Sequence, residues 1–275
     1  MTSRIDARFE ALREQGRAGL VTYVMAGDPD YETSLAIAEA LPKAGADVIE
    51  LGMPFTDPMA DGPAVQAAGL RALKAGQTLK KTIDLVRAFR KGDDATPLIL
   101  MGYYNPIYVY GVEKFLKDAK AAGVDGVIVV DLPPEESGEL RRETDAAGVD
   151  MIHMVAPTST PDRVRLIARR SRGFIYLVSL TGVTGERAVV PDGLEAQVRA
   201  LRLVTTKPIC VGFGISRPEH AAAVGRLADG VAVGSAIVRA VEEHADSPSL
   251  ITDVGDVIES LKAPLRDLGA TPTPS

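Results

Sequence analysis

Eight short apolar runs recur along the chain, separated by polar and amphipathic stretches. They are rich in Val, Ile and Leu, and they are nearly continuous rather than alternating with polar residues. Continuous apolar strands are typical of parallel sheets that are covered on both faces, so we predict such a sheet. The expected strands occupy residues 20–26, 47–52, 97–102, 125–130, 149–155, 173–179, 207–212 and 229–234.

Helical spacing of apolar residues fills the intervals between these runs. Ile5, Phe9 and Leu12 also fall at helical intervals, which predicts an extra amphipathic helix over 3–16, ahead of the first strand. The other expected helices span 31–44, 63–75, 78–91, 111–122, 135–147, 161–171, 193–204 and 217–226.

A short repeat marks three junctions between a helix and a strand. The sequences AGAD, AGVD and AGVD stand before the strands at Val48, Gly126 and Met151. In each copy we expect the glycine to adopt the left-handed conformation that ends a helix, with the strand following at once. The repeat supports a regular alternation of helices and strands.

Such an alternation forms either a (β/α)8 barrel or a large doubly wound sheet. Even spacing, the lack of a G-x-G-x-x-G turn after the first strand, and polar or glycine-rich segments after most strands favour the barrel. We therefore predict the α/β class: a (β/α)8 TIM barrel with an extra N-terminal helix, forming a single domain over 1–268. A disordered tail is expected over 269–275.

Composition limits the classes of function. The chain has 275 residues, a net charge of −6 and no basic cluster, which argues against nucleic-acid binding. No apolar run reaches the roughly 18 residues of a membrane span, and the N-terminus has no signal-peptide core, so we expect a cytoplasmic protein. The three histidines show no metal-ligand spacing, so no metal is expected, and Cys210 in an apolar run is expected to be a buried core residue.

Two carboxylates mark the segment after the second strand. Glu50 lies in an apolar run, where an ionised side chain would be buried without a partner unless the strand end reaches a cavity. Asp61 follows eleven positions later, in a loop rich in proline and glycine that could fold back over the strand end. The two side chains could therefore face one substrate as an acid and base pair.

Glycine-bearing segments follow three late strands, at 182–185, 212–216 and 234–235. Glycine lets backbone N–H groups approach an anion, and Ser235 is expected to begin a helix whose N-terminus favours negative charge. Because barrels often hold phosphate after their last strands, we predict a phosphate site there. The loop 181–191 could close over a ligand, although an ordinary surface loop would have a similar sequence.

An apolar, partly aromatic pocket is expected beside these groups, although most of its residues would belong to the core of any barrel. Its candidate lining residues are Tyr23, Met101, Tyr103, Ile128, Tyr176 and Phe213. The GDP segment at 27–29 is a further candidate. Asp131, which follows the fourth strand, is a candidate too, although we favour a structural role in the N-terminal turn of the next helix, which Pro133 and Pro134 would start.

Several motifs together resemble the tryptophan synthase α subunit family. They are IELGMPFTDPMADGP at 49–63, YNP at 104–106, DGVIVVDLPPEES at 125–137, SLTGVTG at 179–185, GFGIS at 212–216 and VGSAIV at 233–238. The similarity runs from about residue 4 to residue 266. It implies a (β/α)8 barrel that cleaves indole-3-glycerol phosphate to indole and glyceraldehyde 3-phosphate. It also implies no cofactor in this chain and a β subunit with pyridoxal phosphate as partner, in an α2β2 assembly.

The resemblance implies a role for each matching residue. The catalytic glutamate of the family falls on Glu50 and its catalytic aspartate on Asp61. We expect Glu50 to hold a proton in its apolar setting and to act as acid and then base, while Asp61 stays ionised and accepts the indole N–H. The implied substrate-binding residues are Tyr23, Met101, Tyr176, Thr184, Gly185, Phe213, Gly214, Gly234 and Ser235.

The resemblance also implies a partner surface and a closing loop. Asp57, Pro58 and Asn105 match the side of the family's barrel that meets the β subunit. Thr184 matches a loop threonine that closes over the catalytic aspartate. Without the partner this loop would be mostly open, so the isolated chain is expected to be a poor catalyst. Leu180 departs from the family pattern because several relatives carry arginine there, although Arg187 could partly replace its ion pair.

Two other functions remain open from the residues alone. An isomerase or epimerase barrel that binds phosphate would explain the glycines but not the motif with Glu50 and Asp61. A non-catalytic regulatory barrel would bind the phosphate ligand only to activate a partner, and the intact Glu50, Asp61 and Thr184 argue against it.

Overall fold

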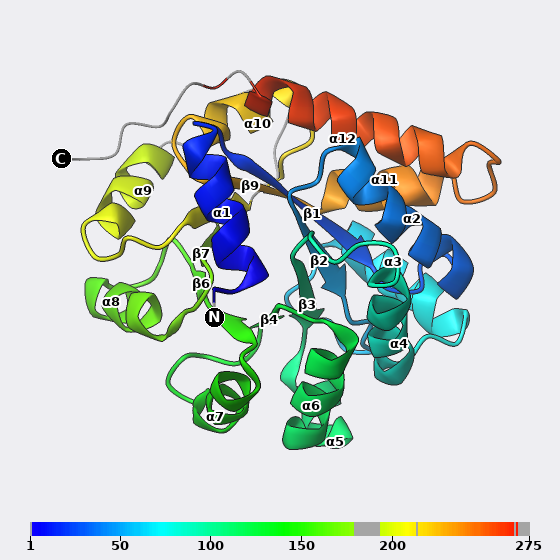
Figure 1. Ribbon diagram of the computed structural model, residues 1–275, viewed down its shortest axis with the longest axis horizontal. Coiled ribbons are helices and arrows are strands. Elements are labelled where there is room, and N and C mark those ends of the chain that lie inside the picture. Colours follow the sequence, from blue (N-terminus) through cyan, green and yellow to red (C-terminus); the bar gives the residue numbers. More distant parts are fainter. Residues whose placement is uncertain (1, 179–192, 213, 267, 269–275) are drawn as a thin grey trace.

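Parallel strands form one sheet at the centre of the molecule, and helices surround it, in the computed structural model of the protein (Figure 1). The structure describes residues 2–178, 193–212, 214–266 and 268. The strands are β1 Gly19–Met25, β2 Val48–Gly52, β3 Leu98–Gly102, β4 Gly126–Val129, β5 Asp150–Ile152, β6 Met154–Val155, β7 Ile175–Val178, β8 Ile209–Gly212 and β9 Gly230–Val233.

The strand order closes the sheet into a barrel. Neighbouring strands follow the order β5-β4-β3-β2-β1-β9-β8-β7-β6, and each pair is parallel. Only His153 separates β5 from β6; β5 pairs with β4, and β6 pairs with β7. The two short strands are therefore the halves of one broken fifth strand. The predicted TIM barrel is confirmed.

Helices alternate with the strands as expected, and all except α1 lie around the barrel. They are α1 Arg4–Glu14, α2 Tyr31–Ala44, α3 Pro63–Lys74, α4 Leu79–Phe89, α5 Tyr104–Tyr110, α6 Val112–Ala122, α7 Gly138–Ala147, α8 Pro161–Arg170, α9 Leu194–Arg202, α10 Pro218–Gly225, α11 Ser235–Glu243 and α12 Leu250–Arg266. Sequence periodicity did not predict α5 or α12. The seven residues of α5 are too few to establish a period, and Pro264 lies inside α12.

The expectation for Asp131 was wrong. Helix α7 begins at Gly138 rather than near residue 135, so Pro133 and Pro134 do not start it. Asp131 Oδ1 instead accepts the backbone N–H of Tyr104 at 2.8 Å, at the start of α5. The carboxylate thus satisfies a free donor at the first turn of a helix that follows the neighbouring strand.

The helix-to-strand repeat carries two separate structural functions. Gly45, Gly123 and Gly148 all have positive φ angles at helix ends, as predicted. The aspartates of the repeat were given no role by the sequence. The backbone N–H of Asp47 donates to Leu20 O at 2.8 Å, and Leu20 N–H donates back to Asp47 Oδ2 at 2.7 Å. Such reciprocal bonds fix the start of one strand against its neighbour.

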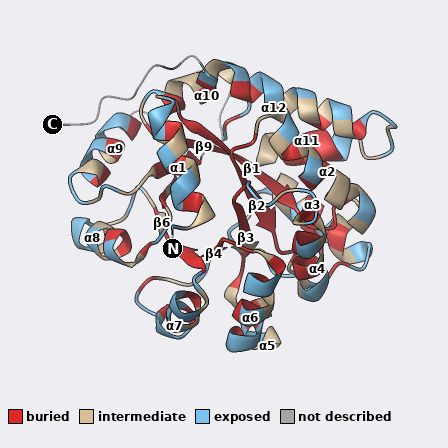
Figure 2. Ribbon diagram, in the orientation of Figure 1, coloured by how far each residue is buried: buried red, intermediate tan, exposed pale blue. Residues whose placement is uncertain are grey.

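Helix α1 closes the barrel at the end where the strands begin. Its buried residues Ile5, Phe9 and Leu12 pack into the core inside the barrel. Glycine is required where they enter, because a Cβ at Gly19 would lie 2.7 Å from Leu12 Cδ1. In Figure 2 the strands are buried almost throughout. A substrate can therefore reach the barrel only from the end where the strands finish.

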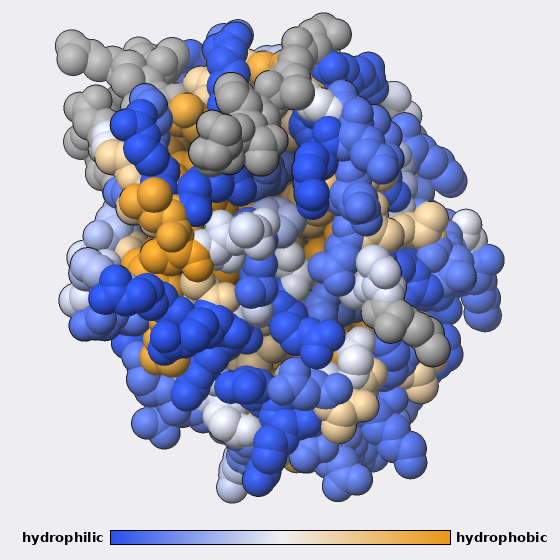
Figure 3. Space-filling view, turned by 60° about the vertical axis from the view of Figure 1, so that its left-hand side comes forward, coloured by the Kyte–Doolittle hydropathy of each residue, from blue (hydrophilic) through white to orange (hydrophobic). Residues whose placement is uncertain are grey.

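The surface is mainly hydrophilic in the view of Figure 3, with a few hydrophobic areas. Among the described residues, the exposed large hydrophobic side chains are Met59, Leu70, Tyr108, Val109, Leu203 and Val204. Within the same part of the chain, no helix is long and apolar enough to cross a membrane.

Candidate active site

The candidate site forms where side chains of several strands point inward above the barrel core. Inward-facing residues alternate along each strand, so the positions two residues after the packed Val21 and Val48 are Tyr23 and Glu50. These two residues lie opposite each other in the register of β1 and β2. Met101 and Tyr176 belong to the same layer and pack against the core beneath it.

Glu50 is buried in this layer, and none of the described residues serves as its counter-ion. Its side chain is 1% exposed, and Oε1 has no hydrogen-bond partner. Burial raises the pKa of this carboxyl to about 8, because the charged form would lose its hydration without compensation. Glu50 is therefore protonated at neutral pH and can donate a proton to a ligand.

Asp61 lies in the loop that connects β2 to α3. The Tyr103 phenol holds this loop, since Ala60 N–H donates to its oxygen at 2.9 Å. Burial raises the pKa of Asp61, and a hydrogen bond with Tyr103 opposes the shift. Asp61 and Glu50 thus differ in environment, because only Glu50 is fully buried and without a polar partner.

Two tyrosines stand beside Glu50. Burial raises the pKa of the Tyr23 phenol well above its usual value, and the charges of Asp61 and Glu50 add to the rise. The pKa of Tyr176 is raised in the same way, by burial and then by Glu50. Both phenols therefore stay neutral and can donate a hydrogen bond.

Each of these phenols packs against a strand-end glycine. A Cβ at Gly52 would lie 2.2 Å from the Tyr23 hydroxyl oxygen. A Cβ at Gly212 would lie 2.4 Å from the Tyr176 hydroxyl oxygen. Any other residue at either position would displace a ring, so these glycines shape the floor of the site.

The start of α11 supplies backbone donors at the same end of the barrel. Gly234 follows β9 and precedes Ser235, the first residue of α11, and no side chain caps this helix. Its first N–H groups are therefore available to an anion. Gly214 is exposed in the segment that follows β8. Thr184, Gly185 and Phe213, with Leu180, Arg187 and the loop 181–191, lie outside the described residues.

The predicted partner residues are more exposed than the side chains around Glu50. Asp57 and Asn105 are exposed and Pro58 is half-buried. They come from the β2 to α3 loop and from α5, which follow neighbouring strands. Met59 in the loop is 82% exposed and Val109 on α5 is 77% exposed.

Sequence reasoning did not identify how Tyr103 and Asp28 act. Tyr103 was only a pocket candidate, but it holds the loop of Asp61; its place directly after a predicted strand was the available signal. Both carboxylate oxygens of Asp28 accept hydrogen bonds from Arg71. Arg71 lies on a predicted helix 43 residues away, so no local pattern pointed to it.

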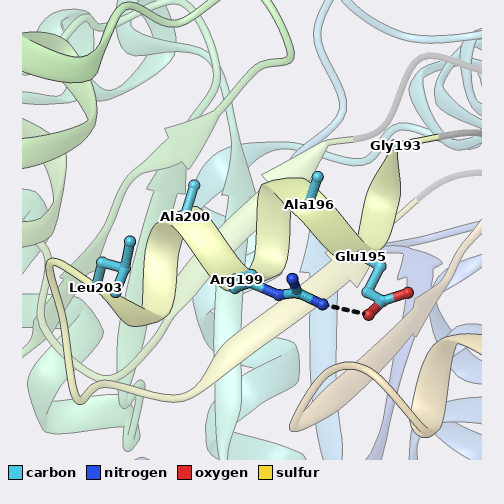
Figure 4. Close-up of a pocket in the computed structure, with 6 residues that line it drawn as sticks. All are labelled: Gly193, Glu195, Ala196, Arg199, Ala200 and Leu203. Atoms are coloured by element: carbon cyan, nitrogen blue, oxygen red, sulfur yellow. Dashed lines mark hydrogen bonds and ion pairs between the residues drawn. The ribbon is translucent and has the colours of Figure 1, made fainter.

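A hollow on the surface of α9 contains none of the predicted site residues. Its volume is about 470 Å³, and Figure 4 shows its lining of Gly193, Glu195, Ala196, Arg199, Ala200 and Leu203 along one helix. Arg199 pairs with Glu195 at 2.6 Å, one turn apart. Among the described residues, no cluster of three potential metal ligands exists.

Comparisons with known proteins agree on one family. The family model described as tryptophan synthase alpha chain matches residues 9–263. The tryptophan synthase alpha chain of Legionella pneumophila subsp. pneumophila is 38% identical, with a TM-score of 0.90 over 98% of this chain and 99% of that one. A tryptophan synthase structure from M. tuberculosis matches with 34% identity and a TM-score of 0.87, covering 96% of this chain and 99% of that one. A structure from Aquifex aeolicus VF5 has 40% identity and a TM-score of 0.88, covering 96% of this chain and 100% of that one.

Proposed function

Because the chain belongs to the tryptophan synthase alpha chain family, we propose that Glu50 and Asp61 are the groups with which it cleaves its substrate. The reaction is the cleavage of indole-3-glycerol phosphate to indole and glyceraldehyde 3-phosphate. This subunit uses no cofactor, and pyridoxal phosphate belongs to the β subunit. The observation that supports our assignment most strongly is the buried, unpaired Oε1 of Glu50.

The reaction moves two protons. Carbon 3 of the indole ring must gain a proton, so that the ring can accept the electron pair of the breaking carbon–carbon bond. The adjacent side-chain hydroxyl must lose its proton as the aldehyde forms. Glu50, protonated at neutral pH, gives the first proton and then accepts the second, which restores its starting state.

Asp61 serves the ring nitrogen in this proposal. Positive charge develops on the ring when carbon 3 is protonated, and an ionised carboxylate beside the N–H stabilises it. The Tyr103 hydrogen bond favours the ionised form of Asp61. Tyr23, Met101 and Tyr176 line the apolar walls against which the ring would pack.

The phosphate would bind at the free N-terminus of α11, through the backbone at Gly234 and Ser235. The uncapped first turn supports this placement. Gly214 would contribute from the neighbouring strand end, and Thr184, Gly185 and Phe213 remain predictions from the sequence. A purely regulatory barrel would not need an unpaired buried carboxyl such as Glu50. The family match argues against an isomerase or epimerase.

We also propose a β subunit as partner, in an α2β2 assembly, with Asp57, Pro58 and Asn105 at the interface. The exposed Met59 and Val109 beside them support this surface, since large exposed hydrophobic side chains gather at protein interfaces. We also propose a cytoplasmic location, which the match to a family of tryptophan-biosynthetic enzymes supports. Cell fractionation would test that location, and recovery in an extracytoplasmic fraction would refute it.

Indole release by purified variants tests the catalytic assignment. Glu50→Gln keeps the size of the side chain but removes the acid, so we expect the rate to fall by about 10²- to 10⁴-fold. Asp61→Asn should reduce it by roughly 10²- to 10³-fold. Each chain is measured with and without a tryptophan synthase β subunit, and substrate binding is measured separately by calorimetry.

The matched control is Glu136→Gln, the same substitution on an exposed glutamate after β4. It should release indole at the wild-type rate. Wild-type turnover by Glu50→Gln would remove Glu50 from the mechanism. A silent wild type with a competent β subunit would overturn the assignment of the whole site.

A further inference from the structure

Asp28 lies at the catalytic end of the barrel, where its carboxylate is held by an arginine. It follows β1 and is only 3% exposed. Both its oxygens are occupied by one guanidinium, with Arg71 Nε 2.8 Å from Oδ1 and Arg71 Nη2 2.9 Å from Oδ2. This bidentate geometry fixes the orientation of both side chains. The acidic residue of the GDP segment therefore has a role other than chemistry.

The same guanidinium reaches a third element. Arg71 Nη1 contacts Glu242 Oε1 at 2.6 Å. Arg71 belongs to α3 and Glu242 to α11, so one side chain joins these two helices to the end of β1. Beneath the ion pairs, Val238 of α11 and Ala68 of α3 belong to one apolar cluster. The two helices thus pack directly against each other.

The starts of these two helices carry the two halves of the proposed site. Helix α3 begins at Pro63, two residues after Asp61, and α11 begins at Ser235. Arg71 lies about 12 Å along α3 from its start, and Glu242 lies about 10 Å along α11, at roughly 1.5 Å per residue. Neither helix has a side-chain cap at its start. The distance between Asp61 and the phosphate donors therefore depends on how the two helices are held together.

We propose that Arg71 is a positioning residue that sets the distance between the Asp61 loop and the phosphate-binding start of α11, by joining α3, α11 and Asp28. This inference rests on the proposed function. A substrate that binds through its ring at one helix and its phosphate at the other gains from both contacts only if the spacing is fixed before it arrives. Lysine cannot replace Arg71, because a single ammonium cannot reproduce the forked contacts to two carboxylates.

The test compares two buried arginine–aspartate pairs at opposite ends of the barrel. Arg71→Met breaks the pair with Asp28. Arg17→Met breaks a similar bidentate pair with Asp47, which stands where β2 begins, with contacts of 3.0 and 3.1 Å. Both variants lose an ion pair to a buried aspartate, so both should melt earlier than the wild type. Only Arg71 adjoins the two helices of the site.

We expect Arg71→Met to weaken the binding of indole-3-glycerol phosphate by about 5- to 10-fold, measured in chains that also carry Glu50→Gln, and to lower kcat/KM by roughly 10²-fold in chains that keep Glu50. Inorganic phosphate contacts only the start of α11 and should bind within about 2-fold of the wild type. Arg71→Lys should recover little of the substrate affinity. Glu242→Met removes only the contact to α11, at a side chain 47% exposed, and should weaken substrate binding by about 2- to 3-fold. Arg17→Met should bind and turn over substrate as the wild type does. Binding is titrated by calorimetry, well below the melting temperature of each chain.

Unchanged substrate binding in Arg71→Met, together with kinetics like those of Arg17→Met, would reduce Arg71 to a structural residue and overturn the proposal. If Arg71→Met does not fold, Glu242→Met decides, and wild-type substrate affinity in that variant would overturn it. Because binding is measured without turnover, a wild type that binds the substrate but releases no indole would count against the proposed catalytic groups alone.

Discussion

At the scale of single residues, the site contains a carboxyl group, that of Glu50, whose burial is unfavourable for stability. Glu50 is fully buried, its Oε1 has no hydrogen-bond partner, and no basic residue among the described ones pairs with it. Most buried carboxyls in this protein are instead held by arginine or lysine, as Asp47 is by Arg17 and Lys262. The contrast identifies Glu50 as a residue kept for reactivity rather than stability.

This arrangement predicts a pH-dependent stability difference between wild type and Glu50→Gln. The carboxyl has a pKa near 4.5 when unfolded and about 8 when folded. Between these values the unfolded chain releases the proton while the native chain keeps it, so wild-type stability falls as pH rises through this window. Glutamine does not titrate. The variant should match the wild type near pH 4.5 and exceed it by a few kcal/mol above about pH 8.

Urea unfolding of the two chains at about pH 5 and pH 9 measures this difference. Other titrating groups are common to both chains and cancel in the comparison. Equal stability of the two chains at both pH values would mean that Glu50 is not the buried neutral acid described above.

At the scale of elements, the two ends of the barrel have different tasks. Helix α1 and the aspartates of the repeat fix the end where the strands begin, and loops and helix starts form the site at the other end. TIM barrels in general divide stability and catalysis in this way. A substitution in α1 should therefore change stability without changing the chemistry.

Phe9→Ala tests this separation. Phe9 is 3% exposed, and its ring centroid lies 5.6 Å from that of Phe174 inside the barrel. Its loss should lower the free energy of unfolding by about 3–5 kcal/mol. At a temperature where the variant stays folded, kcat and KM should remain within about 2-fold of the wild type, because α1 lies at the closed end. Thermal unfolding and indole release measure the two effects, and a large loss of kcat in the folded variant would contradict the separation.

At the scale of the whole molecule, the proposed partner surface can be separated from other exposed hydrophobic side chains. Val109 on α5 is 77% exposed, and Leu203 at the end of α9 is 83% exposed. Val109→Asp should weaken binding to the β subunit by at least about 10-fold, because a charge would be buried at the interface. Leu203→Asp is the matched control and should bind normally.

Sedimentation of each chain with the β subunit measures the association. Indole release without the partner should be the same for both variants, since neither residue lies in the pocket. Normal assembly by Val109→Asp would move the interface away from α5.

The sequence by itself determined the order of strands and helices, the barrel, and the unusual place of Glu50. Each of these follows from local patterns: continuous apolar runs for buried strands, helical spacing between them, and one acidic residue among apolar neighbours. The motifs also placed the chain in its family, which the comparisons confirm.

Only the tertiary structure decided which distant residues work together. Tyr103, which follows β3, accepts a hydrogen bond from the loop that carries Asp61. Asp131 accepts the backbone N–H of Tyr104 at the start of α5, a helix that comes earlier in the chain. Arg71 pairs with Asp28 and Glu242. Glu242 is 171 residues from Arg71 in the chain. Many acidic residues could have paired with this arginine. The choice depends on strand register and helix packing, which bring the ends of separate elements together and leave no local signal in the sequence.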